Sequence, residues 1–133
     1  MAGLQNLANS CYMNCTLQCL SHCKALTNYF LKGDFIKEIN SSNPLGAQGL
    51  ISIAYGKVIK ELWLGDQPVV VPINFKQILG RFKKQFASED QQDSQELLNI
   101  VLDSLHEDLN RVKVKPLVPM LESHGEDDER ASI

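Results

Sequence analysis

Apolar residues recur at three- and four-residue spacing through most of the first 111 residues, and this period predicts a mainly α-helical fold. We expect about five helices, over residues 11–22, 25–32, 47–64, 75–83 and 90–110. The predicted inward faces of the last three are Leu50, Ile51, Ala54, Val58, Ile59 and Leu62; Phe75, Ile78, Leu79 and Phe82; and Leu97, Leu98, Val101, Leu102, Leu105 and Leu109.

Capping and breaking residues set the predicted ends of these helices. Good N-caps precede three of them: Asn9 and Ser10 before the first, Asn74 before the fourth, and Ser88, in a capping box with Gln91, before the last. Gly33 and Gly65 are expected to end the second and third helices. Residues 1–10 are expected to be a loop, and residues 69–71 an extended connector.

The character of the chain changes after residue 111. Residues 112–121, VKVKPLVPML, alternate and contain two prolines, which favours an extended segment. Residues 122–133 are acidic with little apolar content, which predicts a disordered tail. Residues 3–111 are therefore the expected folded unit.

Charge and hydropathy narrow the function classes. The 133 residues include 13 Lys and Arg against 16 Asp and Glu, so the basic excess of a nucleic-acid-binding domain is missing. No apolar run approaches the roughly 18–20 residues that cross a bilayer, and the N-terminus lacks the pattern of a secretory signal. We expect neither nucleic-acid nor membrane partners.

The four cysteines, Cys11, Cys15, Cys19 and Cys23, follow one another at four-residue spacing. On a helix such neighbours have Cβ atoms about 5–6 Å apart, whereas a disulfide needs about 3.8 Å. One helix also cannot wrap four thiolates around one zinc ion, because its first and last thiols lie about 18 Å apart along the axis. We expect reduced thiols, an intracellular location (cytoplasm or nucleus), and no metal or cofactor. Cys15, Cys19 and Cys23 are predicted to be small packing residues on a buried helix.

Cys11 differs from the other three because it stands at the first turn of its helix, after a polar loop. The helix dipole favours a thiolate there, and Asn6 in the loop is a candidate oxyanion donor. From the residues alone, a catalytic cysteine and a buried structural thiol both remain open. No histidine is well placed as a base: His22 is too far along the same helix, His106 reads as solvated or capping, and His124 lies in the acidic tail.

The segment QQDSQE, residues 91–96, places Gln92, Asp93 and Glu96 on one side of the last helix. Two interpretations remain open. The acids form a solvated first turn that complements the helix dipole, or they form a recognition surface for a basic peptide. General acid–base catalysis by the pair is not expected, because nothing in the segment indicates burial.

Two long motifs together resemble the ubiquitin-specific protease family of cysteine deubiquitinases. GLQNLANSCYMNCTLQCL (residues 3–20) is similar to the cysteine box of that family, and QQDSQELLNIVLDSLHEDLNR (residues 91–111) is similar to its second box. The connecting segments NPLG, ELWLG and ILGRFKKQF have a similar order and spacing. The resemblance covers about residues 3–115.

The resemblance implies a fold and a set of roles. The fold is the helical, thumb-like half of a papain-like cysteine protease, without its β-rich half. Cys11 matches the nucleophile and Asn6 the oxyanion-stabilising residue; Asp93 and Glu96 match the acids that hold the Arg-containing tail of ubiquitin, and Gln92 assists there. The implied reaction is hydrolysis of the bond after the terminal glycine of ubiquitin, through an acyl-enzyme. The implied partners are ubiquitin and ubiquitinated proteins.

This chain departs from the family pattern in four places: Ala8 replaces Gly, Ser10 replaces Thr, Cys15 replaces Ser and Leu97 replaces Phe. Ala8 would strain the loop if that position needs a positive φ. The family's histidine box and β-rich half are not found in the 133 residues. We therefore expect a fragment that is inactive alone and that pairs with the missing half of the catalytic domain. The alternative is a non-catalytic module that binds ubiquitin or another partner.

Overall fold

The computed structural model describes residues 2–43 and 46–111. Their elements are β1 (Gly3–Leu4), α1 (Cys11–Ser21), α2 (Lys24–Lys32), α3 (Phe35–Glu38), α4 (Leu50–Leu64), β2 (Val69–Val70), α5 (Ile73–Phe82), the 3₁₀ helix η1 (Lys84–Phe86) and α6 (Ser94–Asp108). The mainly helical prediction is confirmed, and all five expected helices are present; α3 and η1 are additional. The predicted extended segment 112–121 and acidic tail 122–133 lie outside the described residues, so the division at residue 111 stays a prediction.

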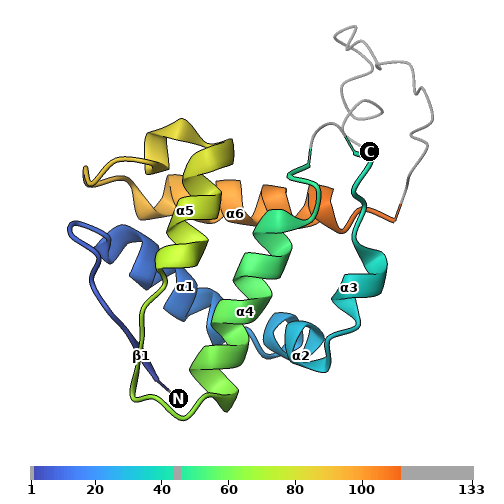
Figure 1. Ribbon diagram of the computed structural model, residues 1–133, viewed down its shortest axis with the longest axis horizontal. Helices are drawn as coiled ribbons and strands as arrows, with labels where there is room; N and C mark the ends of the chain where they lie inside the picture. The colour runs from blue at the N-terminus through green and yellow to red at the C-terminus, as the bar shows by residue number, and fades with distance from the viewer. Residues whose placement is uncertain (1, 44–45, 112–133) are drawn as a thin grey trace, which may run out of the picture.

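The helices pack around α4, which crosses the middle of the molecule (Figure 1). α5 lies beside α4, α6 contacts both α4 and α1, and α2 packs on α4 with α3 next to it. Among the described residues, no helix has both the length and the apolar character needed to span a membrane. The largest completely buried side chains mark the core: Tyr55, Phe75, Phe86, Met13, Leu17, Ile51, Ile59, Leu62, Leu79, Leu97 and Val101.

An aromatic cluster joins α2 and α3 to α4. The ring of Phe30 lies 4.7 Å from that of Phe35 and 4.9 Å from that of Tyr55, between ring centroids. Gly56 makes this approach possible, because a Cβ there would lie 2.7 Å from Cζ of Phe35. The short helix α3 therefore depends on the burial of Phe35 against its neighbours, which a local sequence pattern does not reveal.

The first residues form a strand, so the prediction that residues 1–10 are a loop is wrong for two of them. Gly3 and Leu4 pair in parallel with Val69 and Val70. A further backbone bond runs from the Ala2 N–H to the Leu62 carbonyl, at 2.9 Å. These bonds anchor the N-terminal segment at the end of α4, and the loop that leads to α1 starts from this fixed point.

Several predicted helix ends are correct, and three are not. Gly33 (φ 79°) and Gly65 end α2 and α4 as expected. The helix predicted from residue 47 begins at Leu50, after Gly49 in the left-handed conformation (φ 83°). Asn74 does not cap α5, because the helix already begins at Ile73, with Pro72 at the cap position. The capping box of Ser88 and Gln91 is also wrong: α6 begins at Ser94, with Asp93 as its cap, and Ser88 bonds to Asp90 instead.

The prediction that Cys15, Cys19 and Cys23 pack in the core is wrong, since all three are exposed. α1 turns its other side inward and buries Tyr12, Met13, Thr16, Leu17 and Leu20. The cysteines share their side of α1 with Asn14 and Gln18, and the larger side chains of Met13, Leu17 and Leu20 remove more apolar area from water than thiols do. The predicted inward positions Phe82 and Leu102 are likewise 38% and 43% exposed, while Ile78 is half-buried.

A buried carboxylate at the end of α6 ties that helix to the start of α4. Asp108 is completely buried and accepts hydrogen bonds from the backbone N–H of Ala47 (2.5 Å) and of Ser52 (3.3 Å), and from the Ser52 hydroxyl (3.4 Å). Asn40 and Asn43 donate their amides to backbone carbonyls at the same end of α6. The sequence prediction placed no role on Asp108.

We predict that Asp108→Asn lowers the free energy of unfolding by about 3 kcal/mol, because an amide turns a donor toward groups that already donate. Chemical denaturation of the purified chain measures the change. Asp103→Asn on the same helix is the matched control, since Asp103 is exposed and its loss should cost less than about 0.5 kcal/mol. Equal effects of the two substitutions would contradict the assigned role of Asp108.

Candidate active site

The packing of α1 against α6 brings the two motifs together. Met13 and Leu17 of α1, and Leu97 and Val101 of α6, are all completely buried. At the start of α6, the hydroxyl of Thr16 donates to the Ser94 carbonyl at 3.2 Å. The first turn of α1 therefore lies against the segment that leads into α6.

Cys11 is the first residue of α1 and is exposed. Its thiol Sγ donates to Oε1 of Gln91 at 3.3 Å, across 80 positions of the sequence. With the Thr16–Ser94 hydrogen bond, this contact links the two motifs directly, and it joins two side chains. Gln91 was missed as a site residue because its sequence context suggested a helix cap, and no signal along the chain relates it to Cys11.

The loop before α1 holds Asn6 in a defined orientation. Its Oδ1 accepts two hydrogen bonds, from the Ser10 N–H and from the Ser10 hydroxyl, both at 3.1 Å. The Ser10 hydroxyl also accepts from the Leu7 N–H at 2.7 Å. The Asn6 oxygen is therefore engaged, and no hydrogen-bond acceptor among the described residues holds its Nδ2, which can donate to another group. Ser10, predicted as a helix cap, occupies the cap position, but its side chain orients Asn6 instead of capping α1.

The same loop contains two consecutive left-handed residues, Ala8 (φ 72°) and Asn9 (φ 51°). Asn tolerates this conformation, whereas the Cβ of alanine makes it unfavourable by about 1–2 kcal/mol. Ala8 therefore has the positive φ under which we expected it to strain the loop. The strain lies between the anchored strand β1 and Cys11.

The predicted recognition residues lie at the start of α6. Asp93 and Glu96 are exposed, and Gln92 is half-buried. Oδ1 of Asp93 accepts from the Gln95 N–H at 2.8 Å and so caps α6, while Oε1 of Glu96 accepts from the Gln85 amide at 3.0 Å. Both acids sit at the helix N-terminus, where the dipole favours them. Their predicted role in recognition stays a prediction.

The described histidines do not lie beside Cys11. His22 follows the end of α1, about 16 Å along the helix axis, and its ring faces Trp63 at 5.8 Å between centroids. His106 is exposed, about 18 Å along α6 from Ser94. His124 lies outside the described residues. In residues 2–43 and 46–111, no group of three His, Cys, Asp or Glu side chains is arranged to hold a metal ion.

The other thiols of α1 differ from Cys11 in their surroundings. The neighbouring Cys19, first through the negative charge of its thiolate and then through a hydrogen bond, raises the pKa of Cys15. Cys23 Sγ turns back to the Cys19 carbonyl at 3.8 Å. In this row of exposed thiols, Cys11 is the one at the helix start that contacts a side chain of the second motif.

Comparison with known proteins gives the class of this chain. The sequence profile of the ubiquitin carboxyl-terminal hydrolase family matches residues 2–132. Ubiquitin carboxyl-terminal hydrolase 4 of Bos taurus is 52% identical over 128 residues, and ubiquitin carboxyl-terminal hydrolase 15 of Xenopus tropicalis is 46% identical over 129 residues. These alignments cover 96% and 97% of this chain, but 13% of each relative. The chain belongs to the ubiquitin carboxyl-terminal hydrolase family.

Solved structures give the same fold. The SAGA DUB module of Ubp8, Sgf11, Sus1 and Sgf73 bound to monoubiquitin contains a chain that superposes with a TM-score of 0.66 at 20% identity. The same module bound to ubiquitin aldehyde gives a TM-score of 0.64. Each match covers 81% of this chain and 24% of the other. The fold prediction is confirmed: the described residues form the helical half of this protease fold.

We predict that Ala8→Gly raises the free energy of unfolding by about 1 kcal/mol, because glycine adopts φ 72° without a Cβ clash. Thermal and urea unfolding measure the gain. Ala25→Gly is the matched control: Ala25 is exposed within α2, where glycine should cost about 0.5–1 kcal/mol. Destabilisation by both substitutions would show that the loop is not strained at Ala8.

Proposed function

We propose that this chain forms the cysteine-bearing part of a deubiquitinase active site, with Cys11 as nucleophile and Asn6 as oxyanion donor. The observation that carries the proposal is the contact of Cys11 with Gln91 at the exposed start of α1. It joins the candidate nucleophile to the segment that carries the candidate recognition residues. The oriented carboxamide of Asn6 adds the donor that acyl transfer requires.

The proposed chemistry is nucleophilic acyl transfer. The Cys11 thiolate attacks the carbonyl carbon of the terminal glycine of ubiquitin, and the carbonyl oxygen becomes an oxyanion. Nδ2 of Asn6 and the backbone N–H of Cys11 donate to that oxygen, since the first N–H groups of a helix have no carbonyl of their own. The amine then leaves with a proton, and water hydrolyses the resulting thioester, which releases ubiquitin and the thiol.

For substrate recognition, we propose that Asp93 and Glu96 hold the Arg-containing tail of ubiquitin, with Gln92 beside them. Paired carboxylates suit guanidinium groups, which they bind through short, charge-assisted hydrogen bonds. Both acids are exposed next to the segment that reaches Cys11, so a tail bound there would run toward the thiol.

We further propose that these 133 residues do not complete the reaction by themselves. Deprotonation of Cys11 and protonation of the leaving amine need a general base and acid, and neither His22 nor His106 is near the thiol. Loss of one member of such a catalytic unit reduces turnover by orders of magnitude. The remaining part of the catalytic domain is then the natural partner. A cytoplasmic or nuclear location stays a prediction.

We predict that a ubiquitin probe with a C-terminal electrophile does not label the isolated chain within the time in which a complete family enzyme reacts fully. Intact mass spectrometry measures the adduct, and Cys11→Ser is the control for labelling elsewhere. Rapid labelling of Cys11 would contradict the proposed inactivity and would leave the assignment of the nucleophile standing.

The alternative of a non-catalytic binding module is tested by titrating ¹⁵N-labelled ubiquitin with the chain. We predict that shifts concentrate on the ubiquitin tail, and that Asp93→Asn combined with Glu96→Gln reduces them at least severalfold. Both replacements keep an oxygen acceptor, and Asn remains a good helix cap, so the change removes charge without disrupting α6.

Glu61→Gln combined with Asp66→Asn is the control for net charge, since it removes two negative charges at exposed residues that are distant in sequence from both motifs. If ubiquitin lacking its tail gives the same shifts as the intact protein, tail recognition by Asp93 and Glu96 is wrong. Shifts that persist in the doubly substituted chain would point to a binding surface elsewhere.

A further inference from the structure

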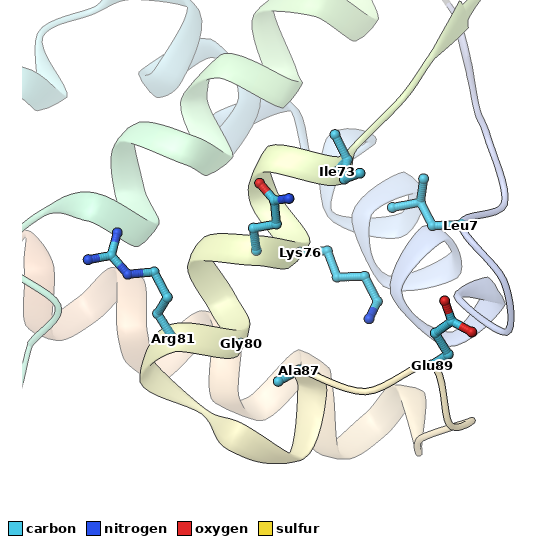
Figure 2. A pocket seen from close by; sticks show the side chains of 8 residues that line it. Leu7, Ile73, Lys76, Gly80, Arg81, Ala87 and Glu89 are labelled. Carbon is cyan, nitrogen blue, oxygen red and sulfur yellow. The ribbon is translucent and has the colours of Figure 1, made fainter.

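Lys76 of α5 reaches across a surface hollow and clamps the segment that leads into α6. Its ammonium group donates to the backbone carbonyls of Ser88, at 2.6 Å, and Phe86, at 3.3 Å. Figure 2 shows the Lys76 side chain extending from α5 toward the segment that carries Ala87 and Glu89. The hollow, of about 670 Å³, also borders Leu7, the neighbour of Asn6.

Two further contacts fix the same segment. Phe86 is completely buried, and its ring stacks on that of Tyr12 at 6.0 Å between centroids. Tyr12 directly follows Cys11. Gly80 of α5 lets the segment approach closely, because a Cβ there would lie 2.9 Å from Cα of Ala87. The chain is thus held at residues 86–88, three positions before Gln91.

Between residue 88 and Gln91, fewer contacts tie the segment to the rest of the protein. Ser88 to Gln91 are exposed, and the contacts of the segment there are local bonds between Ser88 and Asp90 and the contact of Gln91 with Cys11. The Lys76 ammonium group donates to two carbonyls, whereas the Ser88–Asp90 bonds stay within the segment and the Cys11–Gln91 bond joins two neutral groups. Gln91 lies midway between two fixed points, the carbonyl of Ser88 held by Lys76 and the carbonyl of Ser94 held by Thr16. Its position therefore depends in part on where Lys76 holds the carbonyls of Phe86 and Ser88.

We propose that Lys76 is a positioning residue for Cys11, which acts by fixing the segment that places the Gln91 carboxamide against the thiol. While the contact lasts, the thiol hydrogen points at an amide oxygen, which cannot accept the proton outright. Sγ of Cys11 can therefore attack a substrate only after its hydrogen bond to Gln91 breaks. This inference depends on the proposed function in one respect, the assignment of Cys11 as the nucleophile.

The test measures alkylation of the four thiols by iodoacetamide in the full 133-residue chain, resolved by peptide mass spectrometry. The readout is the rate at Cys11 divided by the rate at Cys15, one turn along the same helix. Gln91→Ala should raise this ratio about three- to tenfold, as expected for the loss of one hydrogen bond. Lys76→Met should raise it equally, and the double variant should show no further rise.

Two controls separate positioning from a general loosening of the fold. Lys60→Met removes an exposed lysine of α4 and should leave the ratio unchanged. Lys76→Arg retains a cation that can donate to both carbonyls and should restore the original ratio. Should Lys76→Met fail to fold, Lys76→Gln, with one neutral donor at shorter reach, should give an intermediate ratio.

The proposal fails if Lys76→Met (or Lys76→Gln in its place) behaves like Lys60→Met. It also fails if the effects of Lys76→Met and Gln91→Ala add in the double variant. Because the readout uses no ubiquitin, either result leaves the proposed deubiquitinase function untouched. Conversely, failure of the ubiquitin experiments does not alter the thiol rates.

Discussion

The packing of α1 on α6 is the constraint on which the site depends. Met13 and Leu17 of α1, and Leu97 and Val101 of α6, are completely buried in the core that these helices form with their neighbours. Burial of each such side chain is worth about 1.5–3 kcal/mol, so the register of the two helices is fixed by the core. A slip of one helical turn, about 5.4 Å, would separate Cys11 from Gln91. The core thus determines which exposed groups meet at the start of both helices.

The two ends of α6 are held in different ways. At the far end, the Asp108 carboxylate is buried and accepts backbone and side-chain donors from the start of α4. At the near end, the contacts of Cys11, Asp93 and Glu96 are single hydrogen bonds at exposed side chains. The buried end is held by several hydrogen bonds, whereas the proposed recognition residues lie at the end that is held by single ones. A strained loop at Ala8 lies at the same exposed end.

The periodic pattern predicted the five longer helices, and the two motifs predicted the family, because both signals are local in the sequence. The buried side of α1 was predicted wrongly because thiols count as apolar, although Asn14 and Gln18 share the side of the cysteines and mark it as the more polar one. Gln91 could not be predicted either: its side chain has the chemistry of a helix cap, but its partner is a thiol 80 positions away. The sequence predicted strain at Ala8 only if that position has a positive φ, and the φ of 72° in the loop shows that it does.

In the proposed function, Cys11, presented by the α1–α6 contact, is the nucleophile of a deubiquitinase site. The most direct measurement uses a chimera in which this chain replaces the matching 128-residue segment of the Bos taurus relative. The chimera is treated with a ubiquitin probe that carries a C-terminal electrophile. We expect a single ubiquitin adduct at Cys11, which disappears in Cys11→Ser. A folded chimera that gives no adduct, or an adduct at Cys15, Cys19 or Cys23, would contradict it.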